Sequence, residues 1–126
     1  MDKYPPWLLY LENAVSEEIL FRGIIISFLA LIWPTNVILL IIVSALIYGL
    51  AHFIIFRWQM VLGAFILGLI LGFMFIFIFG ITCSTTPDIF EGMRSIFYAL
   101  FVCTCIHYLV GFLAYKLKFT ERYERK

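Results

Sequence analysis

Charged side chains are scarce in this chain, and the scarcity limits what the protein can be. Only 13% of its 126 residues are charged, whereas 64% are hydrophobic. A soluble domain usually carries about 25% charged residues, so the composition indicates an integral membrane protein. The net charge is +1, and the sequence contains neither a Gly-rich phosphate loop nor a basic stretch with interleaved aromatics. We therefore expect no nucleic-acid partner.

Cysteine is also rare, and the residues that occur are Cys83, Cys103 and Cys105. They form no CxxC motif, and an odd number argues against a disulfide framework, so we interpret them as structural thiols. The sequence start lacks the basic segment and the short apolar core ending in small residues that a cleaved signal peptide shows. We expect this segment to be retained in the membrane.

Long apolar runs are abundant instead. Four of them reach about 20 residues, which is enough to cross a hydrocarbon core about 30 Å thick. Neither an internal repeat nor a low-complexity linker separates them. The sequence thus predicts an all-α integral membrane bundle of about four transmembrane helices in a single domain, residues 1–126. The expected spans are 7–33, 37–56, 60–82 and 96–115, followed by a charged tail at 116–126.

The basic residues predict the orientation of a multi-pass protein in the bilayer. Lys and Arg near membrane ends prefer the cytoplasmic side, and the tail carries several of them. An even number of spans then places both termini in the cytoplasm. The loop with Asp88 and Glu91 falls on the opposite side.

A stripe of small residues lies in the third expected span. Ala64, Gly68 and Gly72 recur at four-residue spacing, so they share one helix face. Small residues let helix backbones approach closely in lipid. We expect this stripe to pack within the bundle rather than to form a homodimer; the sequence leaves the oligomeric state open.

Ionisable residues interrupt the apolar runs at a few positions, namely Glu17, Glu18, Arg22, His52 and His107. Such groups are costly at bilayer depth and usually face a bundle interior or a wet cavity. In the predicted topology they fall in the same leaflet, with His52 about 6 Å and His107 about 12 Å from the inner ends of their spans. The shared depth predicts one common site.

The spacing within this group suggests separate roles. Glu18 and Arg22 are four residues apart, so they can pair on one helix face. Glu17 points about 100° away, which leaves it as the less neutralised carboxylate and the candidate general base. A purely structural reading, in which the three groups only satisfy one another, stays open. Each histidine could bridge helices, hold a water, stabilise an oxyanion or bind a metal, and Glu17, His52 and His107 form a plausible zinc set.

Three motifs carry a family resemblance. Residues 17–23, EEILFRG, resemble the EExxxR motif, often ending in FRG, of the CAAX protease and bacteriocin-processing family of intramembrane proteases, also called CPBP or Abi. Residues 48–52, YGLAH, resemble its FxxxH motif with tyrosine in place of phenylalanine, and His107 stands where the third motif has histidine. The resemblance spans about Val15 to Phe112. Family members often carry Asn or Asp four residues after that histidine, where this chain has Gly111.

The resemblance implies hydrolysis of a peptide bond in a membrane-anchored or prenylated peptide or protein. It implies that Glu17 activates water, that Glu18 and Arg22 support it, and that His52 and His107 position the water or the oxyanion. We expect no cofactor, with zinc as the alternative.

Two other functions are compatible with the sequence. The first is a catalytically inactive relative that acts as a membrane binding or immunity protein, which Gly111 favours. The second is a small transporter or proton-relay subunit, which also needs buried Glu and His. The second is less attractive because the ionisable groups crowd one leaflet and leave no relay through the other.

Overall fold

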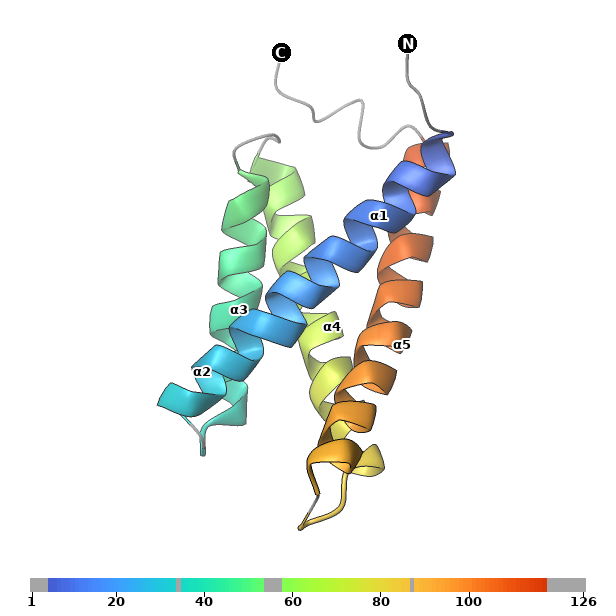
Figure 1. The fold of residues 1–126 in the computed structure, drawn as a ribbon. Coiled ribbons are helices and arrows are strands. Elements are labelled where there is room, and N and C mark those ends of the chain that lie inside the picture. The colour runs from blue at the N-terminus through green and yellow to red at the C-terminus, as the bar shows by residue number, and fades with distance from the viewer. Residues whose placement is uncertain (1–4, 34, 54–57, 87, 118–126) are drawn as a thin grey trace.

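The chain folds into helices throughout the part that its computed structural model describes, residues 5–33, 35–53, 58–86 and 88–117. The all-α prediction is therefore confirmed (Figure 1). In chain order the elements are α1 (Pro6–Glu18), the π-helix η1 (Ile19–Ile26), α2 (Ser27–Ile32), α3 (Val37–His52), α4 (Trp58–Thr82) and α5 (Ile89–Lys116).

The elements α1, η1 and α2 form one continuous rod, because the residues at both junctions keep right-handed helical dihedral angles. Pro6 occupies the first helical position, where its missing amide hydrogen does no harm. The rod ends at Ile32, and Trp33 leaves helical geometry with φ −127° and ψ 66°, as expected for a residue before proline. In Figure 1 the rod starts beside the end of α5 and slants to the start of α3.

Side-chain caps determine where α3 and α5 begin. The Asn36 side chain accepts a hydrogen bond from the Leu39 amide at 3.0 Å, and the Asp88 carboxylate accepts one from the Glu91 amide at 2.7 Å. Such caps satisfy amides that have no partner within the helix. Helix α5 consequently starts at Ile89 and extends beyond the predicted span 96–115 into the segment expected to be a polar loop. Residues 54–56 of the second predicted span and residues 118–126 of the tail lie outside the described residues.

Helices α3 and α4 pack closely through the small-residue stripe. A Cβ atom on Gly68 would lie 3.1 Å from the Cα of Ala45, and one on Gly72 would lie 3.0 Å from Cγ2 of Ile41. The stripe therefore serves packing within the bundle, as predicted. Leu71 and Phe75 of α4 also form an apolar core with residues of η1 and α5, namely Ile26, Ala99 and Cys103.

Much of the apolar surface faces outward, as a membrane bundle requires. Helices α4 and α5 are long and apolar enough to cross a membrane, and only 28% and 17% of their most apolar windows are buried. The core helix of a soluble protein would be mostly buried. Helix α3 is a shorter apolar helix. These features match a helical membrane bundle. The side of the membrane on which each terminus lies stays a prediction.

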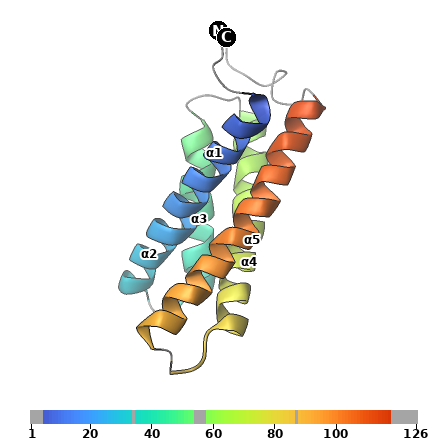
Figure 2. The same cartoon turned by 45° about the vertical axis from the view of Figure 1, so that its right-hand side comes forward.

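The arrangement brings four helix ends together. In Figures 1 and 2 the start of α1, the end of α3, the start of α4 and the end of α5 lie at the same end of the bundle. Helices α3 and α4 lie side by side, and α5 packs against both α4 and α1. Polar residues near these ends can therefore share one cavity.

Candidate active site

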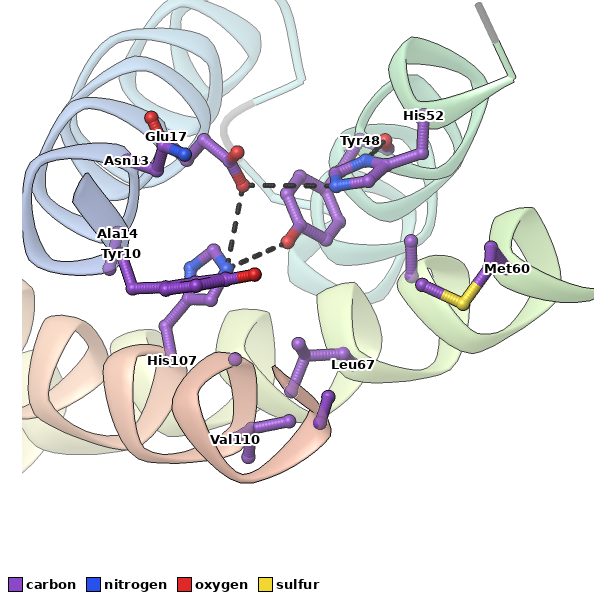
Figure 3. Close-up of a pocket in the computed structure, with 13 residues that line it drawn as sticks. Tyr10, Asn13, Ala14, Glu17, Tyr48, His52, Met60, Leu67, His107 and Val110 are labelled. Carbon is purple, nitrogen blue, oxygen red and sulfur yellow. Dashed lines mark hydrogen bonds and ion pairs between the residues drawn. The ribbon is translucent and has the colours of Figure 1, made fainter. Parts of the chain in front are cut away.

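A cavity of about 190 Å³ opens among these helix ends. Figure 3 shows Glu17 from α1, Tyr48 and His52 from α3, and His107 from α5 directed toward one another around it. Glu18 and Arg22 lie behind this group in the bundle interior. The ionisable residues selected from the sequence thus occupy one cluster.

The inner part of the cluster is a buried ion pair. Glu18 and Arg22 are 0% and 1% exposed, and Nη1 of Arg22 lies 3.2 Å from Oε1 of Glu18. This is the pairing that the four-residue spacing predicts. Nη2 of Arg22 donates to the carbonyl oxygen of Gly68 at 3.4 Å, and the guanidinium lies 4.8 Å from the ring centroid of Tyr48. The cation therefore ties the first rod to both α3 and α4.

The π-helix η1 begins directly after Glu18 and contains Arg22. Single turns of π-helix occur frequently at functional sites, because the wider turn shifts the side chains that follow it. One of its carbonyl groups has a partner on another helix: the Ser44 hydroxyl donates to the Phe21 carbonyl at 3.2 Å. This contact fixes η1 against α3 beside the ion pair.

His107 connects the ion pair to the cavity. Its Nδ1 lies 2.7 Å from Oε1 of Glu18. An ionised carboxylate can only accept a hydrogen bond, so Nδ1 carries a hydrogen and is the donor of this bond. Its Nε2 lies 3.0 Å from the Tyr48 hydroxyl and 3.4 Å from Oε2 of Glu17. Glu18 therefore sets the orientation of the ring and aims Nε2 at the cavity.

His52 is oriented in the same manner by the backbone. Its Nδ1 lies 2.9 Å from the carbonyl oxygen of Tyr48, one helical turn earlier. A carbonyl oxygen can only accept, so Nδ1 is the donor of this hydrogen bond. The other nitrogen, Nε2, faces Oε2 of Glu17 at 4.0 Å.

Glu17 is the more accessible carboxylate, with 29% of its side chain exposed. Its Oε2 lies between the two imidazole rings and has no aligned hydrogen-bond partner among the described residues. A buried carboxylate oxygen of this kind retains its capacity to accept a hydrogen bond. Geometrically, it can hold a water molecule against both rings.

The comparison with protein families supplies the assignment. The family model described as type II CAAX prenyl endopeptidase Rce1-like matches residues 5–113. This chain belongs to that family. Comparison with curated proteins and with solved structures gives no match. The matched residues include the whole cluster, and the Rce1-like family agrees with the resemblance found in the sequence motifs.

The sequence motifs of this Rce1-like chain did not predict that the Tyr48 hydroxyl takes part in the polar cluster. The motif comparison treated the residue only as a replacement for phenylalanine. In the structure Tyr48 is 1% exposed, yet its hydroxyl reaches His107 inside the cavity. The four-residue spacing between Tyr48 and His52 was the available signal, since it places both side chains on one face of α3.

Gly111 lines the same cavity but contributes no side-chain donor. A Cβ atom at this position would lie 3.5 Å from Cδ1 of Tyr10, which is ordinary van der Waals contact. An asparagine or aspartate would extend from that Cβ beside the Tyr10 ring. Tyr10 therefore lies close to the place where many relatives have a polar side chain.

The zinc alternative finds no ready site in the described part of the chain. No group of three His, Cys, Asp or Glu residues there could hold a metal ion. Nε2 of His107, one of the expected ligand atoms, already contacts the Tyr48 hydroxyl. Zinc binding by Glu17, His52 and His107 stays a prediction, and the chemistry below is derived without a metal.

Proposed function

We propose that this Rce1-like protein is an intramembrane endopeptidase that hydrolyses a peptide bond through a glutamate-activated water. The observation that supports this most directly is the position of Glu17, whose Oε2 lies 3.4 Å from Nε2 of His107 and 4.0 Å from Nε2 of His52. A carboxylate beside two ring nitrogens in a cavity is a suitable place to hold and deprotonate water.

The reaction can be written with the residues at hand. Glu17 accepts a proton from the water while the water oxygen attacks the carbonyl carbon of the scissile bond. The resulting tetrahedral intermediate collapses when the carbon–nitrogen bond breaks, and the protonated Glu17 gives its proton to the leaving amine. The products are a carboxylic acid and an amine, which exchange a proton to become a carboxylate and an ammonium ion, and Glu17 returns to its ionised form.

The remaining residues position the reacting groups. His52 and His107 flank the water, and their Nδ1 atoms are held by the Tyr48 carbonyl and by Glu18. Arg22 keeps the Glu18 carboxylate in place. Such orientation lowers the barrier because the groups need no rearrangement during the reaction.

The family indicates the class of substrate. Rce1-like proteins are described as CAAX prenyl endopeptidases, so we propose a membrane-anchored, prenylated peptide or protein. A cavity at one end of an otherwise apolar bundle suits a substrate whose lipid lies in the bilayer and whose peptide reaches the site from the adjacent surface.

The test is cleavage by the purified full-length protein in detergent micelles. The substrates are a prenylated CAAX-type peptide and a library of membrane-anchored peptides. We expect turnover by the wild type, and a loss of about 10²–10⁴-fold in Glu17→Gln, the usual contribution of a general base. Glu12→Gln, an exposed position on the same helix, is the matched control and should keep its activity.

The outcome that contradicts the proposal is equally clear. A folded wild type that cleaves neither substrate, or a Glu17→Gln variant that cleaves as fast as the wild type, would exclude it. Binding of the peptides without cleavage would favour the inactive relative, which the missing side chain at Gly111 also suggests.

A further inference from the structure

The proposed reaction creates a negative charge on the substrate that the site must stabilise. Attack on the carbonyl carbon moves charge onto the carbonyl oxygen, and enzymes stabilise this oxyanion with hydrogen-bond donors placed in advance. His52 and His107 each use Nδ1 on a partner outside the cavity, so each ring has only Nε2 to offer to the oxyanion. A further donor beside these two nitrogens would strengthen the hold on the oxyanion.

The Tyr48 hydroxyl is such a donor, and it lies in the same cavity as Glu17. This hydroxyl lies 3.0 Å from Nε2 of His107, and a phenolic hydroxyl always carries a hydrogen that it can donate. The alternatives in the cavity are less suitable. Asn13 is exposed, and the Tyr10 ring packs at a tilt against Tyr115, with ring centroids 5.3 Å apart, farther toward the helix ends. Gly111 contributes no side-chain donor.

We propose that the Tyr48 hydroxyl is a catalytic residue that donates a hydrogen bond to the oxyanion in the peptide hydrolysis proposed above. This inference rests on that function and assigns a residue to a step that it leaves open.

The hydrogen bonds can be exchanged without leaving an acceptor unpaired. When Nε2 of His107 is unprotonated, the Tyr48 hydroxyl donates to it in the resting site. When Glu17 takes the proton from water, its Oε2 becomes a donor that lies 3.4 Å from the same Nε2. Glu17 can then replace Tyr48 as the donor to His107, and rotation about the phenolic C–O bond directs the tyrosine hydrogen to the oxyanion. No proton is gained or lost by tyrosine in this step.

The surroundings hold the phenol in place and favour negative charge beside it. The Tyr48 ring makes edge contacts with Phe21 and His52, with ring centroids 4.9 Å and 4.6 Å away. The Arg22 guanidinium lies 4.8 Å from the ring centroid. A rigid donor beside a buried cation needs no reorganisation when charge develops, which is the feature that makes an oxyanion donor effective.

The experiment compares Tyr48→Phe with the wild type on the substrate that the wild type cleaves, in the full chain. This substitution keeps the ring contacts and removes only the hydroxyl. We expect kcat to fall about 10²-fold or more with KM little changed, because the bond to the oxyanion exists only in the transition state. The matched control is Tyr108→Phe, one residue beyond His107, whose ring stacks on Phe112 outside the cavity.

A second measurement separates contact with the oxyanion from an indirect role in holding His107. The scissile carbonyl is replaced by a thiocarbonyl, whose sulfur accepts hydrogen bonds weakly. If Tyr48 contacts this atom, the rate ratio between oxygen and sulfur substrates is large in the wild type and collapses in Tyr48→Phe.

An unchanged ratio, or a Tyr48→Phe variant with wild-type kcat, overturns the assignment of Tyr48 while leaving the hydrolase itself in place. Failure of the wild type to cleave, in contrast, overturns the proposed function and this inference together.

Discussion

Replacing Arg22 with methionine tests whether the buried ion pair holds the site together. The guanidinium and the Glu18 carboxylate are almost fully buried, and Nη1 lies 3.2 Å from Oε1. At this distance two unit charges attract by about 5 kcal/mol with an effective dielectric constant of about 20. Removing Arg22 leaves the buried Glu18 carboxylate with only the hydrogen bond from Nδ1 of His107, and breaking a buried ion pair costs about 3–5 kcal/mol. We expect Arg22→Met to lower the free energy of unfolding by this amount.

A second variant separates the loss of charge pairing from the loss of packing. In the double variant Glu18→Gln/Arg22→Met no unpaired charge remains, and the amide oxygen of Gln can still accept from Nδ1 of His107. The double variant should therefore be more stable than Arg22→Met alone, with a coupling energy of about 1–3 kcal/mol.

The assay is unfolding of the purified protein in mixed detergent micelles, followed by far-ultraviolet circular dichroism. Arg94→Met, the same substitution at an exposed arginine of α5, is the control and should change stability by less than about 0.5 kcal/mol. The reasoning fails if Arg22→Met costs no more than this control, or if the double variant is less stable than Arg22→Met.

Three further predictions concern packing, orientation and metal dependence. Gly68→Val should destabilise the bundle by about 1–3 kcal/mol in the same assay, because the new Cβ would lie 3.1 Å from the Cα of Ala45. Gly63→Val is the control and should cost much less, because nothing lies within 4 Å of a Cβ there. Equal costs for the two variants would contradict the close approach of α3 and α4. A cysteine at exposed Thr86, introduced after the native cysteines are replaced, should react with an impermeant maleimide only from outside the cell, and labelling from the cytoplasmic side alone would reverse the predicted orientation. Peptide hydrolysis should survive dialysis against a chelator, whereas a loss restored by zinc would establish the metal alternative.

Local sequence patterns predicted the helices well because they depend on neighbouring residues. Apolar run length predicted helices near the observed ones, and Pro34 explained the end of the first rod after Ile32. The start of α5 was harder to predict. The segment before residue 96 is polar and looks like a loop, but the Asp88 cap on the Glu91 amide allows the helix to start at Ile89.

The site was predictable only in part. Spacing along one helix predicted the pair of Glu18 and Arg22, since residues four apart share a face. The predicted topology placed His52 and His107 in the same leaflet, and the structure brings both beside Glu17. The π-helix and the donation from Arg22 to the Gly68 carbonyl were not foreseen, because they depend on how η1 contacts α3 and α4.

The sequence by itself determined the class of the molecule, the number and approximate bounds of its helices, and the ionisable residues that must be shielded from lipid. These properties follow from apolar length and from the cost of burying charge, which are set residue by residue. The tertiary structure alone decided that the Tyr48 hydroxyl meets Nε2 of His107 and that Glu17 lies between two imidazole rings. Such contacts join different helices, so they depend on the angle and the distance at which the helices pack. Residue spacing along the chain predicts neither of these two quantities.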